Sequence, residues 1–263
     1  MTAQSSSLDP KITWLICTNK DDALLHRAIQ SCLTQTMHSF ELLVVVNGID
    51  YVEILRDLQH RYAGDSRAKI FGTPIRLLNF SLSIGLHHAR SPYIARMDAD
   101  DVAAPDRLER QWTFLEKNSR VAVLGSAYHL IDSQDRIHGE VNCPLTDAEI
   151  RRKLFFRNPI CHPSVMFRRD AIQTVGGYLG GQNAEDYDLW LRIAMQKEWE
   201  FANLPEKLLS YNVSLDGSAR RSRTAYANVA AAQLRNFLVT REPRWLLGTA
   251  LTSAKSFFRA SRA

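Results

Sequence analysis

The sequence lacks the features that mark several large classes of protein. No run among its 263 residues reaches the roughly 18 apolar residues that a membrane-spanning helix needs. Its four cysteines form neither a CxxC pair nor a dense framework, which favours reduced, mostly buried thiols. Residues 1–10 have no basic start and no apolar core, so they do not predict a signal peptide. We therefore expect a protein of the cytoplasm.

The common nucleotide and hydrolase motifs are also missing. The sequence has no GxGxxG after a strand pattern and no GxxxxGKS/T, which argues against dinucleotide-dependent redox chemistry and P-loop hydrolysis. It has no HExxH and no GxSxG, which argues against zinc hydrolysis and a serine nucleophile on a strand-to-helix turn. Isolated histidines such as His87, His88 and His162 are either ligands or, as is more usual, hydrogen-bonded loop and core residues.

Composition and charge indicate a folded body with a basic end. Apolar residues make up 45% of the chain and charged residues 23%, which is ordinary for a globular protein. The net charge is +5, but residues 218–263 hold nine basic residues and one acid, a net +8, which leaves −3 for the rest. This distribution argues against a protein that binds nucleic acid along its length and favours a single anionic partner surface.

Strand and helix patterns alternate through the chain. Short apolar strand patterns occupy residues 12–18, 40–46, 69–71, 93–97, 121–131 and 164–167, with an edge strand at 208–213. Helix patterns lie between them, including 52–62, 82–90, 106–118 and 146–156. This order predicts an α/β fold with a mostly parallel sheet, in which ligands bind beyond the carboxyl ends of the strands. The remainder, residues 216–263, is basic and helical in pattern.

Two acidic clusters stand at such positions. Asp98, Asp100 and Asp101 directly follow a buried strand, where mutual repulsion is costly unless a cation or donors offset it. Hard oxygen ligands favour Mg²⁺ or Mn²⁺ with substrate phosphates, although an acidic helix start ahead of a proline would give the same pattern. Glu185 and Asp186 follow a glycine-rich loop at a helix start, either as caps or as a general base.

Five segments of the chain together resemble glycosyltransferase family 2. The central one is YIARMDADD at residues 93–101, followed by APDRLERQ at 104–111. The others are AIQSCLTQT at 28–36, NPICHPSVMF at 158–167 and AEDYDLWLR at 184–192, in the order and spacing of the family. The resemblance covers roughly residues 11–215.

The resemblance implies a fold and a site. Members have the GT-A fold, a Rossmann-like, mostly parallel sheet flanked by helices. A domain of residues 1–215 would then divide into a nucleotide-binding half at about 11–101 and an acceptor-binding half at about 102–215, followed by a basic helical tail at 216–263.

The family motif also implies roles for individual residues. Asp98 would contact the nucleoside side of the donor, and Asp100, with Asp98 as a further ligand, would hold Mn²⁺ or Mg²⁺. Asp186 would deprotonate the acceptor hydroxyl in an inverting displacement. The remaining nucleotide-sugar contacts would come from Thr18, Asn19, Asn47 and Glu185.

The implied function is transfer of a sugar from a nucleotide sugar to a hydroxyl of a glycan or lipid-linked glycan. Such a reaction would serve cell-surface polysaccharide or lipid-linked oligosaccharide synthesis. Two alternatives remain open at this point: a catalytically silent sugar-nucleotide-binding or scaffold protein, and a nucleotidyltransferase. The absence of a QxxRW-like segment argues against a processive polysaccharide synthase.

The sequence departs from the family pattern at two places. Val46 and Asn47 stand where an acidic pair usually touches the base, and a neutral amide matches the imide edge of uracil, which favours a UDP-sugar. Residues 212–214 lack the usual arginine and histidine after the last strand, so part of the diphosphate or metal shell is missing there. We expect the cations Arg220, Arg221 or Arg223 to supply that charge.

The end of the chain has a separate pattern. Residues 243–263 interleave aromatics and leucines with basic side chains, which is typical of an interfacial helix at an anionic membrane surface. A C-terminal helix docked on the body would give the same pattern. On the first reading the protein is peripheral on the cytoplasmic face of the membrane, close to a lipid-linked acceptor.

Overall fold

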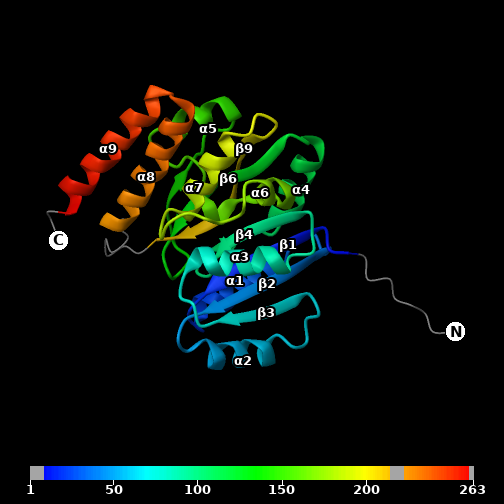
Figure 1. The fold of residues 1–263 in the computed structure, drawn as a ribbon. Coiled ribbons are helices and arrows are strands. Elements are labelled where there is room, and N and C mark those ends of the chain that lie inside the picture. Colours follow the sequence, from blue (N-terminus) through cyan, green and yellow to red (C-terminus); the bar gives the residue numbers. More distant parts are fainter. Residues whose placement is uncertain (1–8, 214–221, 261–263) are drawn as a thin grey trace.

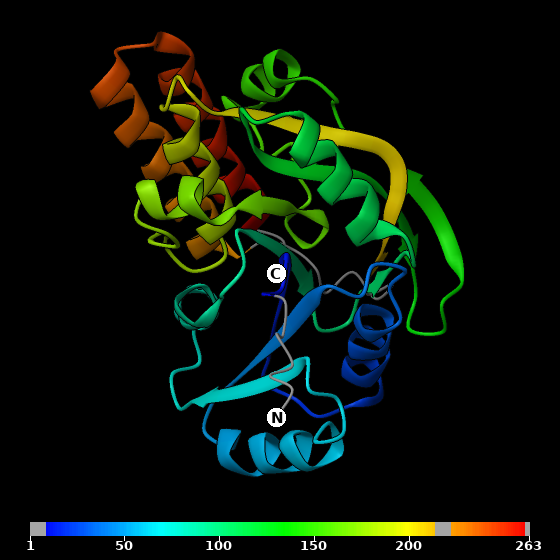
Figure 2. The ribbon, with the colours of Figure 1, turned by 90° about the vertical axis from the view of Figure 1, so that its right-hand side faces the viewer.

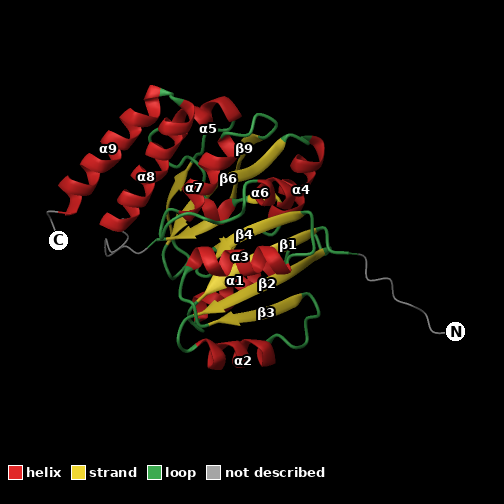
Figure 3. Cartoon of the chain, in the orientation of Figure 1, coloured by secondary structure: helices red, strands yellow, loops and turns green. Residues whose placement is uncertain are grey.

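A single sheet crosses the molecule, with helices packed on both of its faces (Figure 1, Figure 3). The structure is a computed structural model that describes residues 9–213 and 222–260. Within these ranges the sheet has nine strands in the order β3-β2-β1-β4-β8-β6-β9-β5, with β7 paired to β6. The strands are β1 Ile12–Thr18, β2 Phe40–Asn47, β3 Ala68–Thr73, β4 Tyr93–Asp98, β5 Val102–Ala103, β6 Val121–Ile131, β7 Ile137–Val141, β8 Met166–Arg168 and β9 Glu200–Asn212.

The helices lie mostly where the periodicity predicts them. They are α1 Ala23–Leu33, α2 Tyr51–Arg61, α3 Leu78–His88, α4 Arg107–Lys117, α5 Asp147–Leu154, α6 Arg169–Thr174, α7 Glu185–Ala194, α8 Arg223–Thr240 and α9 Pro243–Ala260. Asp22 caps α1 by accepting a hydrogen bond from the Leu25 N–H at 3.0 Å. Thr146 and Glu149 form a capping box at α5, which explains why this short polar helix starts where it does.

The first four strands are parallel, and β1, β2 and β4 are buried on both faces. Because neighbouring side chains of a strand point to opposite faces, Leu15 packs with α3 on one side while Trp14 and Ile16 pack with α1 on the other. Both faces are therefore apolar, and this explains why β1 and β2 are continuous apolar runs rather than alternating ones. The parallel arrangement brings the ends of β1, β2 and β4 to one edge.

The second half of the sheet is mixed, and it differs from the sequence prediction most clearly at β9. β8 runs antiparallel to both β4 and β6, while β9 runs parallel to β6. The prediction of an edge strand at 208–213 is wrong, because β9 begins at Glu200 and lies between β6 and β5. The pairing jumps from Leu204 to Lys207, so Pro205 lies in a bulge that hides the strand pattern before it.

The helix α4 is tied to the sheet by two buried polar side chains. Arg107 donates from Nη2 to the carbonyl oxygens of Arg96 at 2.8 Å and Val165 at 3.3 Å, and its guanidinium lies 4.7 Å from the Trp14 ring centre. Gln111 donates to the main-chain carbonyls of Leu124 and Ser164. These contacts satisfy buried main-chain carbonyls near β4, β6 and β8 that water does not reach. They explain why the segment APDRLERQ has an arginine and a glutamine at these two positions.

We expect Arg107→Ala to lower the free energy of unfolding by about 3 kcal/mol, because it leaves buried carbonyls without donors and opens a cavity. Urea denaturation followed by circular dichroism measures the loss. Arg110→Ala is the matched control: Arg110 is exposed on the same helix and pairs only with the surface carboxylates of Asp106 and Glu206. Equal losses from both variants would contradict the structural role of Arg107.

The basic C-terminal segment folds into two helices that pack on each other and on the body (Figure 1). The Trp245 side chain is 6% exposed and its ring centre lies 4.3 Å from that of Phe155. A Cβ on Gly248 would lie only 2.0 Å from the Phe155 carbonyl oxygen, so α9 approaches the body very closely there. The docked-helix interpretation of this segment is thus confirmed for α9. No helix in the described part of the chain is long and apolar enough to cross a bilayer.

Candidate functional site

A cavity of about 400 Å³ opens at the carboxyl ends of β1, β2 and β4. Its lining includes five of the residues that the sequence predicts as donor contacts: Thr18, Asn19, Asn47, Asp98 and Asp100. They come from three separate strand ends and meet here because the strands are parallel neighbours.

Local hydrogen bonds fix the chain at the ends of β1 and β2. The Thr18 hydroxyl donates to the Lys20 carbonyl at 2.8 Å and accepts from the Lys20 N–H, which turns the chain sharply after β1. Asn47 uses one amide N–H to donate to the Ser81 hydroxyl at 3.0 Å, and this leaves its other N–H available to a ligand. Arg76 also lines the cavity, and when the Asn19 amide oxygen faces it, Arg76 donates at 2.9 and 3.1 Å.

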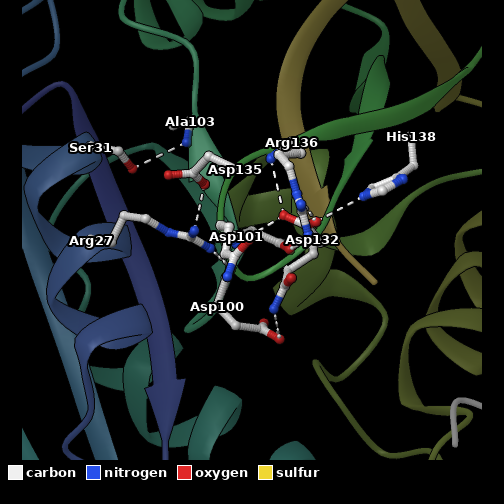
Figure 4. A network of polar contacts seen from close by, with 11 residues as sticks. Arg27, Ser31, Asp100, Asp101, Ala103, Asp132, Asp135, Arg136 and His138 are labelled. Atoms are coloured by element: carbon white, nitrogen blue, oxygen red, sulfur yellow. Dashed lines mark hydrogen bonds and ion pairs between the residues drawn. The ribbon is translucent and has the colours of Figure 1, made fainter. Parts of the chain in front are cut away.

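In the acidic cluster, Asp98 and Asp100 line the cavity, whereas Asp101 supports the fold. Asp101 is fully buried and accepts the Asn212 N–H at 2.8 Å, so it fastens the end of β9 to the end of β4. The Asn212 side chain donates to Asp100 Oδ2 at 3.3 Å. Arg27 of α1 donates to the Asp100 carbonyl at 2.8 Å and pairs with Asp135 (Figure 4). Asp100 thus keeps its carboxylate at the cavity while its backbone is held from the other side.

Asp135 belongs to the turn between β6 and β7, which reaches over toward α1 (Figure 2). The turn is organised by Asp132, which accepts hydrogen bonds from the Arg136 backbone and side chain and pairs with His138 (Figure 4). Hydrogen bonds from His138 and Arg136 hold the pKa of Asp132 well below its usual range. The β6–β7 hairpin and α1 are therefore joined next to the acidic cluster.

Charge in the cluster is offset by Arg96, a buried residue that the sequence analysis did not single out. Arg96 precedes Asp98 by two residues on β4 and forms an ion pair with it. Burial, together with the neighbouring Asp98 carboxylate, raises the pKa of Asp100 above its usual range. The Nε and Nη1 groups of Arg96 have no protein partner although they are buried. They are available for a polar ligand.

The oxygen ligands at the cavity fit a divalent cation. No cluster of three or more His, Cys, Asp or Glu side chains in the described residues is arranged to hold an ion by itself. Asp98 and Asp100, at the end of β4, line the cavity with hard carboxylate oxygens, while the third acid of the lining, Asp22, caps α1. Mg²⁺ is usually held by one or two carboxylates together with waters and substrate phosphates, so this pair suits an ion that arrives with a diphosphate.

A second cavity of about 600 Å³ adjoins the first and shares Asp98 and Leu78 with it. Glu185 and Asp186 line it at the start of α7. The Asp186 carboxylate accepts from the Asn158 amide at 2.6 Å and from the Tyr187 N–H at 2.7 Å. These two donors fix its orientation at the cavity wall.

Glu185 and His162 lie deeper in the same wall. The Glu185 side chain is 6% exposed, its Oε2 has no partner, and burial raises the pKa of this carboxyl. His162 bonds to the Tyr178 hydroxyl at 2.8 Å, and burial lowers its pKa well below the usual range. His162 is therefore a neutral, hydrogen-bonded core residue rather than a free ligand.

Three polar residues of the site were absent from the sequence prediction. Asn158 orients Asp186, Asn212 bonds Asp100, and Arg96 offsets Asp98. Asn158 and Arg96 lie inside the motifs that were recognised, so their place was available, whereas Asn212 was noted only as a departure. Arg223 is the first residue of α8, while Arg220 and Arg221 lie outside the described residues.

Comparison with known proteins connects this geometry to a family. The family described as Glycosyl transferase family 2 matches residues 13–176. The O-antigen biosynthesis glycosyltransferase WbnJ of Escherichia coli is 36% identical over 88% of this chain and 90% of its own length. The amylovoran biosynthesis glycosyltransferase AmsE of Erwinia amylovora is 29% identical over 86% of this chain and 84% of its own.

Solved structures agree on the fold. The mannosyltransferase PcManGT from Pyrobaculum calidifontis, in complex with GDP-Man and Mn²⁺, has a TM-score of 0.66 at 19% identity and covers 97% of this chain and 76% of its own. S. aureus TarS 1–349 in complex with UDP-GlcNAc has a TM-score of 0.65 at 14% identity, over 85% and 66% of the two chains. The predicted GT-A fold is confirmed, and the chain belongs to glycosyltransferase family 2.

Proposed function

We propose that the protein is an inverting, metal-dependent glycosyltransferase that moves a sugar from a UDP-sugar to a glycan hydroxyl. The main support for this proposal is the position of Asp98, which lines both cavities. A nucleotide sugar bound in the smaller cavity would therefore place its sugar at the larger cavity, whose lining includes Asp186. Residues 11–101 and 102–215 would be the donor and acceptor halves of one domain, with 216–263 as its tail.

The donor would be held by side chains of three strand ends. Asp98 would accept from the ribose hydroxyls, Asn47 would meet the base, and Thr18 and Asn19 would close the wall after β1. The free N–H of Asn47 supports a pyrimidine with an acceptor carbonyl, and this is the reason for choosing uridine. Glu185 would lie under the transferred sugar.

Asp100, with Asp98 beside it, would hold Mn²⁺ or Mg²⁺ against the donor diphosphate. The ion, when bound, would offset negative charge that develops on the leaving diphosphate. Asn212 keeps the Asp100 carboxylate directed at the cavity. Arg220, Arg221 or Arg223 would add positive charge on the diphosphate.

Asp186 would take the proton of the acceptor hydroxyl as that oxygen attacks the anomeric carbon from the side opposite the leaving group. One base suffices because a single displacement forms no covalent sugar–enzyme intermediate. Asn158 and the Tyr187 N–H keep the carboxylate in one orientation, which lowers the entropy cost of reaching the reactive geometry.

The experiment that tests the proposal identifies the product released from a panel of UDP- and GDP-sugars with Mn²⁺. Release of UDP supports the proposed activity, and NMR of the product shows whether the anomeric configuration inverts. Release of pyrophosphate would identify a nucleotidyltransferase instead. No turnover of a donor that binds would identify a silent binding or scaffold protein.

The acceptor class is proposed from the relatives and from α9. WbnJ and AmsE act in O-antigen and amylovoran biosynthesis by name, and another relative, 27% identical over 79% of this chain, is a galactosyltransferase named for a diphosphoundecaprenol-linked acceptor. We propose a glycan acceptor of a surface polysaccharide, carried on a lipid, with residues 243–263 in peripheral contact with an anionic membrane. Large apolar side chains exposed on α9 support this: Leu246, Leu247, Leu251 and Phe257.

We expect Leu246, Leu247 and Leu251 changed together to serine to weaken binding to anionic vesicles about 10-fold or more, because apolar area no longer enters the interface. Sedimentation with vesicles measures this. Deleting α9 would be a poor test, since it exposes the Phe155 surface. The control changes Ile49, Val52 and Ile137 to serine, three exposed apolar residues outside α8 and α9. Unchanged sedimentation of the α9 variant would refute membrane contact through this helix.

A further inference from the structure

The lining of the larger cavity includes two cations that form no salt bridge within the described part of the chain. Lys153 and Arg157 line this cavity together with Asp186, and neither forms an ion pair with any other described residue. Arg151, by contrast, pairs with Asp147 and donates to the carbonyls of Ala194 and Trp199, so it is fully used by the fold. The two rim cations are therefore available to a ligand in the cavity.

The nearest acid to Lys153 on its own helix is already engaged. Glu149 accepts from the backbone N–H groups of Thr146 and Leu145 in the capping box at the start of α5. Lys153 lies half-buried at the last turn of α5 and lines the cavity. Arg157 is exposed and directly precedes Asn158, whose amide holds Asp186. Both cations thus belong to the acceptor side rather than to the donor cavity.

The other face of the same segment supports the C-terminal helices. Phe155, between the two cations, packs beneath Trp245, and the Arg244 guanidinium lies 4.3 Å from its ring centre. Its carbonyl accepts from the Gln233 amide at 3.0 Å. The exposed Leu246 and Leu247 follow Trp245 directly in α9. Residues 153–157 therefore carry the two cations of the rim and, through Phe155, contact the part of α9 that has the exposed apolar side chains.

From this arrangement we propose that Lys153 and Arg157 bind the diphosphate of a lipid-diphosphate-linked sugar acceptor. The sugar occupies the cavity beside Asp186, the diphosphate bridges the two cations at the rim, and the lipid leaves toward α9. Two charge-assisted contacts on one dianionic linker place the acceptor hydroxyl and favour lipid-linked over free glycans. The proposal rests on the proposed function, since it assigns the acceptor of that same site.

The test is calorimetric titration of the full-length protein with farnesyl diphosphate, with UDP and Mn²⁺ present to fill the donor cavity and GDP in a parallel series. We expect binding to the wild type and an affinity about 30-fold lower in the Lys153→Gln, Arg157→Gln double variant. Farnesol should not bind measurably, because it lacks the diphosphate. Arg152→Gln is the matched control, an exposed residue of α5 outside the cavity lining, and should bind as the wild type does.

Three results would overturn the assignment: no binding to the wild type, binding that disappears when the nucleotide is added, or equal affinities of the wild type and the double variant. The last would mean that the two cations only complement the C-terminal end of α5. Donor turnover separates this outcome from failure of the proposed function. A wild type that releases no UDP from any UDP-sugar rejects the proposed function, while the farnesyl diphosphate titration still decides what the rim binds.

Discussion

Asp186→Asn is expected to reduce the rate of sugar transfer about 1,000-fold while the donor binds within about twofold of the wild-type affinity. Asp186 lines the larger cavity and is absent from the smaller one, so on the proposed function its loss removes the base and leaves the nucleotide contacts intact. Transfer is measured as UDP release with acceptor, and donor binding by calorimetry. The two readouts together separate a chemical defect from a binding defect.

The matched control for this variant is Asp170→Asn. Asp170 is the second residue of α6, as Asp186 is of α7, and each accepts a hydrogen bond from the N–H of the next residue, at 2.8 and 2.7 Å. Asp170 is exposed and lines neither cavity. Any loss that comes only from weakening a helix start should appear in both variants. Similar, modest losses in the two would reject Asp186 as the base and leave it as a helix-terminal residue.

The buried strands were predictable because burial on both faces leaves a continuous apolar run. β1, β2 and β4 follow that rule, and the structure has them within a residue or two of the predicted bounds. β7 was not predicted, because its side chains are mostly exposed and no apolar pattern marks it. β9 was predicted only at its end, since the bulge at Pro205 interrupts the alternation that identifies a strand. Both β7 and β9 form by pairing with β6, and the sequence pattern within a strand does not show which distant strand it will pair with.

The same distinction holds for the candidate site. Asp98, Asp100 and Asp186 stand in local motifs, so their types and neighbours were enough to select them. Asn212 could not be assigned in that way, because it reaches Asp100 across 112 positions, and the pairing of β9 with β5, directly after the acidic cluster, brings it there. The sequence showed that an expected arginine and histidine were missing after Tyr211, but not that an amide would face the acidic cluster.

This contact makes the second large prediction sharper. Asp100→Ala is expected to lower Mn²⁺-dependent affinity for the donor about 100-fold, since it removes a carboxylate from a pair and leaves a site that few other ligands complete. Binding of the nucleotide in EDTA should change little, because the contacts of Thr18 and Asn47 are untouched. Calorimetric titration of UDP with and without Mn²⁺ measures both values.

Asp101→Ala separates loss of the ion from damage to the fold. Asp101 is buried, and its Oδ1 accepts the Asn212 N–H at the end of β9, so this variant should lower the unfolding midpoint more than Asp100→Ala does. Its effect on Mn²⁺-dependent binding should be smaller, because Asp101 does not line the smaller cavity. If the Asp101 variant instead loses Mn²⁺ dependence while Asp100→Ala keeps it, the assignment of the two carboxylates is reversed. Burial of one acid and exposure of its neighbour to the cavity predict the opposite, because an ion that arrives with a diphosphate can reach only the acid that faces it.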